Sequence, residues 1–292
     1  MAARSRSWGD LVRVAALGVA LGVALGFVAC TGTPSDSPDG APATASATPT
    51  STLTYAPGLT ADLYLPRAGR RVALVVMVPG GGWMTADPTG FAGLAAALAA
   101  GGAAAAPVHI RAAEDGVTYP APVDDVLCAV SAIVHEVQAR RLVPDPVVVL
   151  GHSSGAHLAA LAVLAVDDFA PTCRHPVVRP DALIGLSGPY DISRVPDLAS
   201  ALLGTTPDED PAGWSSANPV ERAGLRPEVP VLLLHGERDD QVPVGFTIQL
   251  DGALESAGHP TTVELVPEAT HDTIYTGDVS AELVLAWLDS VI

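Results

Sequence analysis

A five-residue segment near the middle of the chain has the residue types and spacing of a serine nucleophile. The segment 151–155 reads Gly-His-Ser-Ser-Gly, follows the apolar run 146–150 and precedes an Ala/Leu-rich stretch at 156–162. A strand, a tight turn and a helix in this order form the context in which Gly-x-Ser-x-Gly lifts a serine hydroxyl out of a sheet. The glycines allow close backbone approach because they have no Cβ. We therefore predict that Ser153 is a nucleophile.

A serine needs a base that takes its proton and an acid that orients the base. Downstream of the serine, the buried run 231–234 leads into a polar loop that contains Asp239 and Asp240, and His271 follows the strand-like run 262–266. The order serine, acid, histidine places all three at one edge of a parallel sheet. We predict His271 as the base, and from the residues alone Asp239 and Asp240 are both candidates for the acid.

The remaining pattern alternates between strands and helices. Near-continuous apolar strands separated by helical runs predict a mostly parallel, doubly wound sheet with helices on both faces. Strands are expected at 61–65, 72–78, 103–108, 147–150, 183–187, 231–234 and 262–266, and helices at 91–100, 123–140, 156–166, 244–257 and 281–292.

Several motifs in this order resemble the α/β-hydrolase carboxylesterases of the hormone-sensitive-lipase-like and feruloyl-esterase-like (BD-FAE-like) group, to which kynurenine formamidase is related. The resemblance covers roughly residues 59–290. It is carried by Asp-Leu-Tyr-Leu-Pro at 62–66, Pro-Gly-Gly-Gly-Trp at 79–83, the serine segment, Ser-Gly-Pro-Tyr-Asp at 187–191, His-Gly-x-x-Asp-x-x-Val-Pro at 235–243, and His271. It implies an α/β-hydrolase fold and makes Asp239, four residues after the histidine of its loop, the acid.

The resemblance also implies an oxyanion hole. The glycine run after the strand 72–78 is similar to the His-Gly-Gly-Gly loop of the group, which makes the backbone N–H groups of Gly81 and Gly82 donors, with that of Ser154 as the third. Pro79 departs from the group, because it stands where histidine is usual. The donors are backbone groups, so we expect the hole to function with proline there.

Three aromatic residues are candidates for the substrate pocket. Trp83 directly follows the glycine run, and Tyr190 and Trp214 lie in a Pro-, Asp- and Gly-rich insertion at 190–228. In this fold such an insertion forms a small cap between the sixth and seventh strands. An ordinary core position is the alternative for each of the three.

The chain has the marks of neither a metal enzyme nor a nucleotide-dependent one. No pair of histidines with a third ligand has metal-site spacing, and no glycine-rich phosphate loop follows a strand. We predict no metal and no cofactor. His152, His157 and His235 are expected to be packing or hydrogen-bonded residues rather than catalysts.

The N-terminal region predicts export. Arginines precede an uncharged run at 14–29 that ends at Cys30, the pattern of a signal peptide. The end of this run resembles a bacterial lipobox, which implies lipidation of Cys30; plain secretion and an uncleaved anchor are the alternatives. We expect a signal segment at 1–30, a disordered Thr/Ser/Pro/Ala linker at 31–52 that lacks apolar side chains to bury, and a catalytic domain at 53–292. The protein would face outward on the cell envelope or be secreted.

The charge of the chain disfavours some partners, and its cysteines suggest a disulfide. The formal net charge is −17, which repels nucleic acid and anionic lipid head groups. Cys128 and Cys173 form an even pair in an exported chain, which favours a disulfide; two free thiols are the alternative.

Together these features predict an exported serine hydrolase, a carboxylesterase that acts on a small-molecule ester with a small or medium acyl group. Amide or short-peptide hydrolysis on the same three residues is the enzymatic alternative. A non-catalytic surface binding module built on a hydrolase fold is the other, although the intact Ser/Asp/His set weighs against it.

Overall fold

The computed structural model describes residues 48–291. The predicted signal segment, Cys30 and residues 31–47 of the predicted linker lie outside the described residues. No helix within the described range is long and apolar enough to cross a bilayer.

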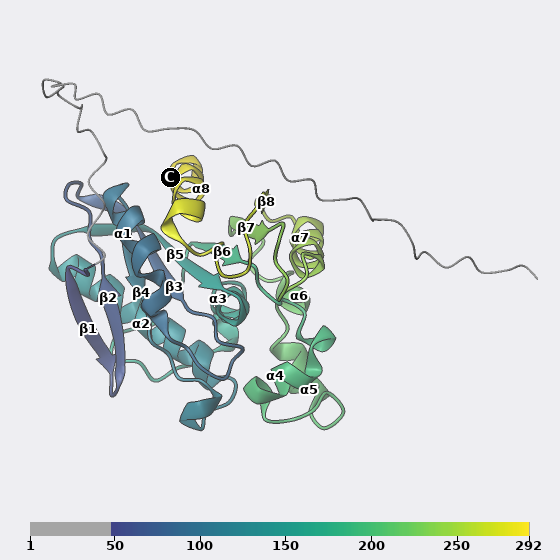
Figure 1. Cartoon of the computed structure of the whole chain (residues 1–292). Coiled ribbons are helices and arrows are strands. Elements are labelled where there is room, and N and C mark those ends of the chain that lie inside the picture. The colour runs from purple at the N-terminus through teal and green to yellow at the C-terminus, as the bar shows by residue number, and fades with distance from the viewer. Residues whose placement is uncertain (1–47, 292) are drawn as a thin grey trace, which may run out of the picture. The chain divides into compact units, whose positions relative to one another are not determined.

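A parallel sheet of six strands forms the centre of residues 48–291, in the order β4-β3-β5-β6-β7-β8 (Figure 1). Each neighbouring pair is parallel, which confirms the predicted doubly wound sheet. The strands are β3 (Arg71–Val78), β4 (Ala104–Pro107), β5 (Val143–His152), β6 (Ala182–Leu186), β7 (Val231–Gly236) and β8 (Thr261–Val266).

Alternate residues of the central strands pack into two separate cores, because successive side chains of a strand point to opposite faces. On β3, Leu74 and Val76 belong to one core, whereas Val75 and Met77 belong to the other. The first core also takes residues of α2 (Ala121–Ala139), α3 (Ser154–Leu164) and α7 (Gly245–Ala257), and the second those of α1 (Ala92–Ala100) and α8 (Gly277–Val291). Helices therefore cover both faces, as the apolar strands require.

The first predicted strand lies outside this sheet. It is β2 (Leu59–Leu63), and it pairs antiparallel with β1 (Ser51–Ala56). Ser51 and Thr52 thus belong to a strand, although they fall at the end of the predicted linker. The side chain of Tyr55 is 6% exposed, so the hairpin gains apolar burial that the polar residues before it cannot supply.

The insertion between β6 and β7 is helical and lies at one side of the sheet (Figure 1). Its helices are α4 (Pro196–Leu203), α5 (Pro211–Ser216) and α6 (Pro219–Arg222), and short 3-10 segments elsewhere are η1 (Pro88–Phe91), η2 (Ala113–Asp115), η3 (Val166–Asp168) and η4 (Ile192–Arg194). Asp191 near the start of the insertion is held to the α5–α6 region and to α7, because its carboxylate accepts hydrogen bonds from the Asn218 amide, 2.9 Å away, and from Gln249 of α7.

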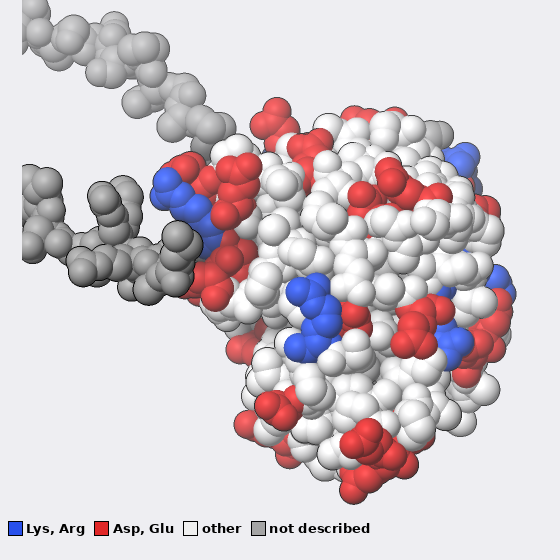
Figure 2. Space-filling model, turned by 90° about the vertical axis from the view of Figure 1, so that its right-hand side faces the viewer, with Lys and Arg blue, Asp and Glu red and all other residues white. Residues whose placement is uncertain are grey.

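Acidic side chains are spread over the face shown in Figure 2, with arginines set among them. This distribution agrees with the formal net charge of −17.

The predicted disulfide is present between Cys128 of α2 and Cys173 of the loop after η3, with the two Cα atoms 5.1 Å apart. The cysteines are 45 residues apart in the sequence, and the segment between them includes β5, Ser153 and α3. The bond therefore closes a loop around the predicted nucleophile.

We expect reduction of this bond to destabilise the domain. Closing a loop of this length stabilises by about 4 kcal/mol in the chain-entropy model, which corresponds to a Tm lower by roughly 10 °C for a domain of this size. The measurement is thermal unfolding of the Cys30→Ser variant with and without reductant. An unchanged Tm, or two free thiols titrating in denaturant without reductant, would show that the bond is not formed.

Candidate active site

Ser153 lies on a sharp turn between β5 and α3. Its backbone has φ 53° and ψ −128°, a conformation that a serine adopts only when surrounding contacts enforce it. The flanking glycines are required by packing: a Cβ on Gly151 would collide with the Gly155 carbonyl, and one on Gly155 with the Val78 carbonyl. The turn therefore needs the glycine spacing from which the nucleophile was predicted.

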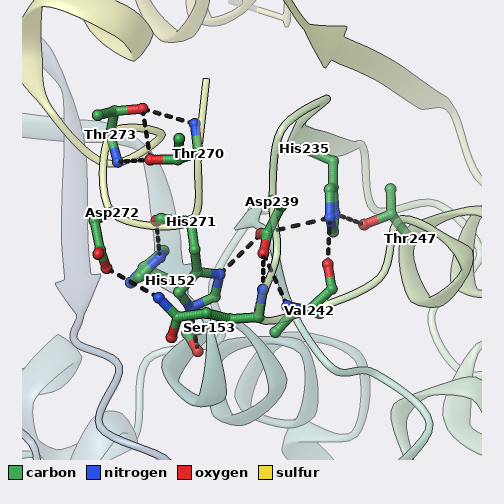
Figure 3. Close-up of polar contacts among 11 residues, drawn as sticks. His152, Ser153, His235, Asp239, Val242, Thr247, Thr270, His271, Asp272 and Thr273 are labelled. Atoms are coloured by element: carbon green, nitrogen blue, oxygen red, sulfur yellow. Dashed lines mark hydrogen bonds and ion pairs between the residues drawn. The ribbon is translucent and has the colours of Figure 1, made fainter. Parts of the chain in front are cut away.

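The predicted base and acid lie in one row with this serine (Figure 3). His271 Nε2 is 2.9 Å from Ser153 Oγ, and His271 Nδ1 is 2.8 Å from Asp239 Oδ2. An ionised carboxylate only accepts hydrogen bonds, so Nδ1 carries the hydrogen and Nε2 accepts one from the serine hydroxyl. This tautomer is the one that general-base catalysis requires.

Asp239 is held as a carboxylate. Its side chain is 1% exposed, and its Oδ1 accepts the backbone N–H groups of Gln241 and Val242 at 2.9 and 2.8 Å. Burial alone would raise the pKa of this carboxyl, but the hydrogen bonds from His271 and from these N–H groups outweigh it and hold the pKa well below its usual range. Asp240, the other candidate, is exposed.

His235 supports the acid loop, as expected of a hydrogen-bonded histidine. It is fully buried, and burial lowers its pKa, so the ring is neutral. Its Nε2–H donates to the Val242 carbonyl at 2.9 Å, while Nδ1 accepts from the Thr247 hydroxyl at 2.8 Å (Figure 3). The ring therefore fixes the turn whose N–H groups bind Asp239.

The glycine run forms a loop against the nucleophile. A Cβ on Gly80 would lie 2.9 Å from Ser153 Cβ, and Gly81 and Gly82 have φ of 141° and 60°. Within residues 48–291, the N–H groups of Gly81, Gly82 and Ser154 donate no hydrogen bond. Ser154 also begins α3, whose N-terminus favours negative charge. These three groups are therefore free to bind an oxyanion.

We expect Gly81→Ala to impair this loop. A Cβ there would collide with the Thr85 carbonyl, and the φ of Gly81 disfavours any other residue. Displacing an oxyanion donor lowers kcat by about 10²–10³-fold. Steady-state kinetics measures the effect, with Gly93→Ala as control because its Cβ would meet nothing within 4 Å. Wild-type kcat in folded Gly81→Ala would contradict this role of the loop.

A cavity of about 350 Å³ opens beside the serine. Its lining is mostly glycine and polar side chains, with Phe91 and Tyr275 as the aromatic residues. The lining residues are Gly80, Gly81, Gly82, Asp87, Gly90, Phe91, His152, Ser153, Gln241, His271, Asp272 and Tyr275.

The predicted pocket aromatics need correction, since Trp83, Tyr190 and Trp214 do not line this cavity. They are 4%, 0% and 5% exposed and belong to the core on the α2/α3 side of the sheet. Large aromatic side chains gain more from burial in a core than from lining a small polar cavity. All three therefore occupy core positions, and Trp83 also borders a smaller pocket that Ser154 lines.

His152 packs beside the base, as expected of a packing or hydrogen-bonded histidine, together with Tyr275, which sequence reasoning missed. Tyr275 and His152 pack against each other with ring centroids 4.4 Å apart, and His152 lies 4.6 Å from the His271 ring. Burial, and after it the adjacent His271, lowers the pKa of His152 to about 3, so this ring is neutral. Its Nε2–H donates to the His271 carbonyl at 2.9 Å, which helps to fix the backbone of the base.

A parallel sheet covered on both faces, with a serine on a strand–helix turn and the acid and base following it in the chain, defines an α/β-hydrolase fold. The chain belongs to the BD-FAE family, whose model matches residues 61–254.

Curated relatives include several esterases. The chain is 28% identical to the probable isoprenylcysteine alpha-carbonyl methylesterase ICME of Oryza sativa subsp. japonica, over 74% of this chain and 56% of that protein. It is 25% identical to Esterase LipQ of Mycobacterium tuberculosis, over 74% of this chain and 54% of that protein. The chain thus spans about half the length of the curated relatives it matches.

Solved structures support the fold. A truncated carbohydrate esterase from gut microbiota aligns with a TM-score of 0.70 at 20% identity, covering 84% of this chain and 98% of that one. The propionate-bound esterase Est2 of Thermogutta terrifontis aligns with a TM-score of 0.65 at 24% identity, covering 80% of this chain and 88% of that one.

Proposed function

We propose that this chain is a serine hydrolase that cleaves carboxylic esters through Ser153, His271 and Asp239. The observation that carries the proposal is the unbroken row of hydrogen bonds from Asp239 through His271 to Ser153 Oγ. Its serine end lines a cavity that the glycine loop also lines. Membership of the BD-FAE family and the esterase names of the relatives support an ester as substrate.

In the first half of the reaction, Ser153 Oγ attacks the acyl carbon while His271 Nε2 takes the hydroxyl proton. Asp239 stabilises the imidazolium that forms, and the N–H groups of Gly81, Gly82 and Ser154 bind the oxyanion. The imidazolium then protonates the leaving alcohol, and the acyl group stays on Ser153.

In the second half, water enters the place that the alcohol has left. His271 takes its proton, the hydroxide attacks the acyl carbon, and the same N–H groups bind the second oxyanion. Collapse of this intermediate returns the proton to Ser153 Oγ and releases the carboxylic acid.

The size of the cavity supports an ester with a small or medium acyl group. At about 350 Å³ it stands near the lower end of ligand pockets, which span about 300–1,000 Å³. The Thermogutta esterase was solved with propionate and with butyrate bound, which supports the same acyl range.

A panel of p-nitrophenyl esters from acetate to decanoate tests the proposal, with a peptide and a formanilide as amide controls. We expect kcat/KM to be highest for the short acyl chains and to fall by roughly tenfold or more at the long end. Hydrolysis of the amides in preference to every ester would contradict the proposal.

We also propose that the enzyme is exported and held on the outer face of a membrane through a lipid on Cys30. The basic residues before an uncharged run that ends at Cys30 support this, since this order is the pattern of a signal sequence. The segment that follows would act as a tether.

We expect the wild-type chain, expressed in a bacterium with lipoprotein processing, to partition into detergent, and Cys30→Ser to remain in the aqueous phase. One acyl chain binds a membrane only marginally, so the lipoprotein should carry more than one. Phase partitioning with Triton X-114 is the measurement. Equal partitioning of the two chains would indicate an uncleaved helix or no anchor.

A further inference from the structure

The residue that follows the glycine loop has a backbone conformation that its side chain disfavours. Trp83 has φ 61°, in the left-handed region that bulky residues rarely occupy. Such a conformation persists only where surrounding contacts enforce it. Because Gly81 and Gly82 come directly before Trp83, whatever holds this residue also sets where their N–H groups point.

The contact that holds the Trp83 side chain is His157. The indole Nε1–H donates to His157 Nδ1 at 3.3 Å, and the two rings meet edge to face with centroids 5.3 Å apart. The indole is 4% exposed and the histidine 0%, so water does not compete for this bond. On the other side of the ring, His157 Nε2 lies 2.8 Å from the Ala217 carbonyl.

The protonation state of His157 suits this double role. Burial lowers its pKa to about 4, against the opposing effect of the hydrogen bond to Ala217, so the ring is neutral at physiological pH. A carbonyl oxygen only accepts, so the single ring hydrogen is on Nε2 and Nδ1 is the acceptor that the indole requires. Both ring nitrogens are therefore used, and the ring has one orientation.

The place of His157 in the chain links the loop to the nucleophile. His157 is four residues after Ser153, on the first turns of α3, so both move with the same helix. A second anchor acts on the backbone, since the Trp83 carbonyl accepts the Ala113 N–H at 3.0 Å. The contact between Trp83 and His157 thus holds the glycine loop in a fixed position relative to α3, the helix that follows Ser153.

We propose that His157 is a positioning residue of the oxyanion hole, which holds the N–H groups of Gly81 and Gly82 in place by fixing Trp83. Its backbone N–H donates to the Ser153 carbonyl at 3.4 Å, but its ring bonds only Trp83 and the Ala217 carbonyl and does not line the cavity beside Ser153, so the side chain acts through Trp83. The inference rests on the proposed function, because an oxyanion hole has meaning only in an enzyme that forms an oxyanion.

Three variants separate the hydrogen bond from the shape of the ring. His157→Phe and Trp83→Phe each keep an aromatic ring and lose the bond between the two residues. His157→Asn keeps an acceptor near the position of Nδ1. We expect the two phenylalanine variants to lower kcat by about tenfold with KM nearly unchanged, short of the 10²–10³-fold loss of a whole donor, and His157→Asn to retain most of kcat.

Two further readouts distinguish positioning from mere stability. Affinity for a boronic acid, which mimics the tetrahedral intermediate, should fall in parallel with kcat, whereas affinity for the product alcohol should not. The double variant Trp83→Phe/His157→Phe should lose no more than either single one, because both remove the same bond. His259→Phe is the matched control, since His259 is also buried with both ring nitrogens near carbonyls, those of Val229 and Ala223. It should lower Tm without changing kcat.

Wild-type kcat and boronate affinity in His157→Phe would overturn the inference, as would losses that add in the double variant. Equal losses in His157→Asn and His157→Phe would do the same. If His157→Phe does not fold, Trp83→Phe with the boronate decides by the same criterion. These outcomes require ester turnover by the wild type that Ser153→Ala abolishes; without such turnover the proposed function fails first, and this inference with it.

Discussion

Ser153→Ala and His271→Ala are each expected to lower kcat for a p-nitrophenyl ester by about a millionfold. The serine hydroxyl and His271 Nε2 are 2.9 Å apart and act as one unit, so the loss of either removes nucleophilic catalysis as a whole. For the same reason the double variant should be no worse than either single one. Steady-state assays with active-site titration of the wild type measure the effect.

Two controls accompany this experiment. Circular dichroism must show that each variant is folded, because lost activity in unfolded protein proves nothing. Ser256→Ala changes an exposed serine of α7 and should leave kcat unchanged. Turnover within tenfold of wild type in folded Ser153→Ala would mean that another residue attacks the ester.

Asp239→Asn should lower kcat by about 10⁴-fold with the fold intact. An amide in place of the carboxylate cannot stabilise the imidazolium, and its NH₂ group favours the tautomer of His271 with the hydrogen on the wrong nitrogen. Asp239 accepts from His271 Nδ1 at 2.8 Å and from two backbone N–H groups, so no other carboxylate takes its place without a change in the loop. The assay is the same ester hydrolysis at constant pH.

Asp240→Asn is the matched control, because it makes the same chemical change one residue away on an exposed side chain. It should leave kcat within about twofold of wild type, as surface substitutions usually do. A silent Asp239→Asn together with a damaging Asp240→Asn would assign the acid to the wrong residue.

The parts of the fold that the sequence predicted are those set by local pattern. Each of three neighbouring patterns is compatible with only one local structure. The apolar run of β5 favours a strand, the glycines around Ser153 a tight turn, and the stretch after it a helix. The side chains of β3 pack alternately into two cores, which likewise follows from a strand with apolar residues on both faces. The choice of Asp239 over Asp240 came instead from a family resemblance, and the structure places the side chain of Asp239 beside His271.

The parts that it did not predict depend on contacts between distant segments. Tyr190 and Trp214 were placed in the pocket because they lie in the insertion, yet both are buried in the core, and no local pattern distinguishes these outcomes. The strand β1 includes Ser51 and Thr52, the last two residues of the predicted linker. It forms because β2 pairs with it. The bond from Trp83 to His157 joins residues 74 apart in the sequence, so it needed the assembled sheet to become visible.

The central claim is that Ser153 is the activated nucleophile, and covalent labelling with a fluorophosphonate tests it most directly. Mass spectrometry of the native protein should find one adduct per chain, on the peptide that contains Ser153. An ester substrate should slow its formation, and His271→Ala should abolish it, because the serine reacts only when its proton is taken. A native, folded protein that forms no adduct, or forms it on another serine, would contradict the account.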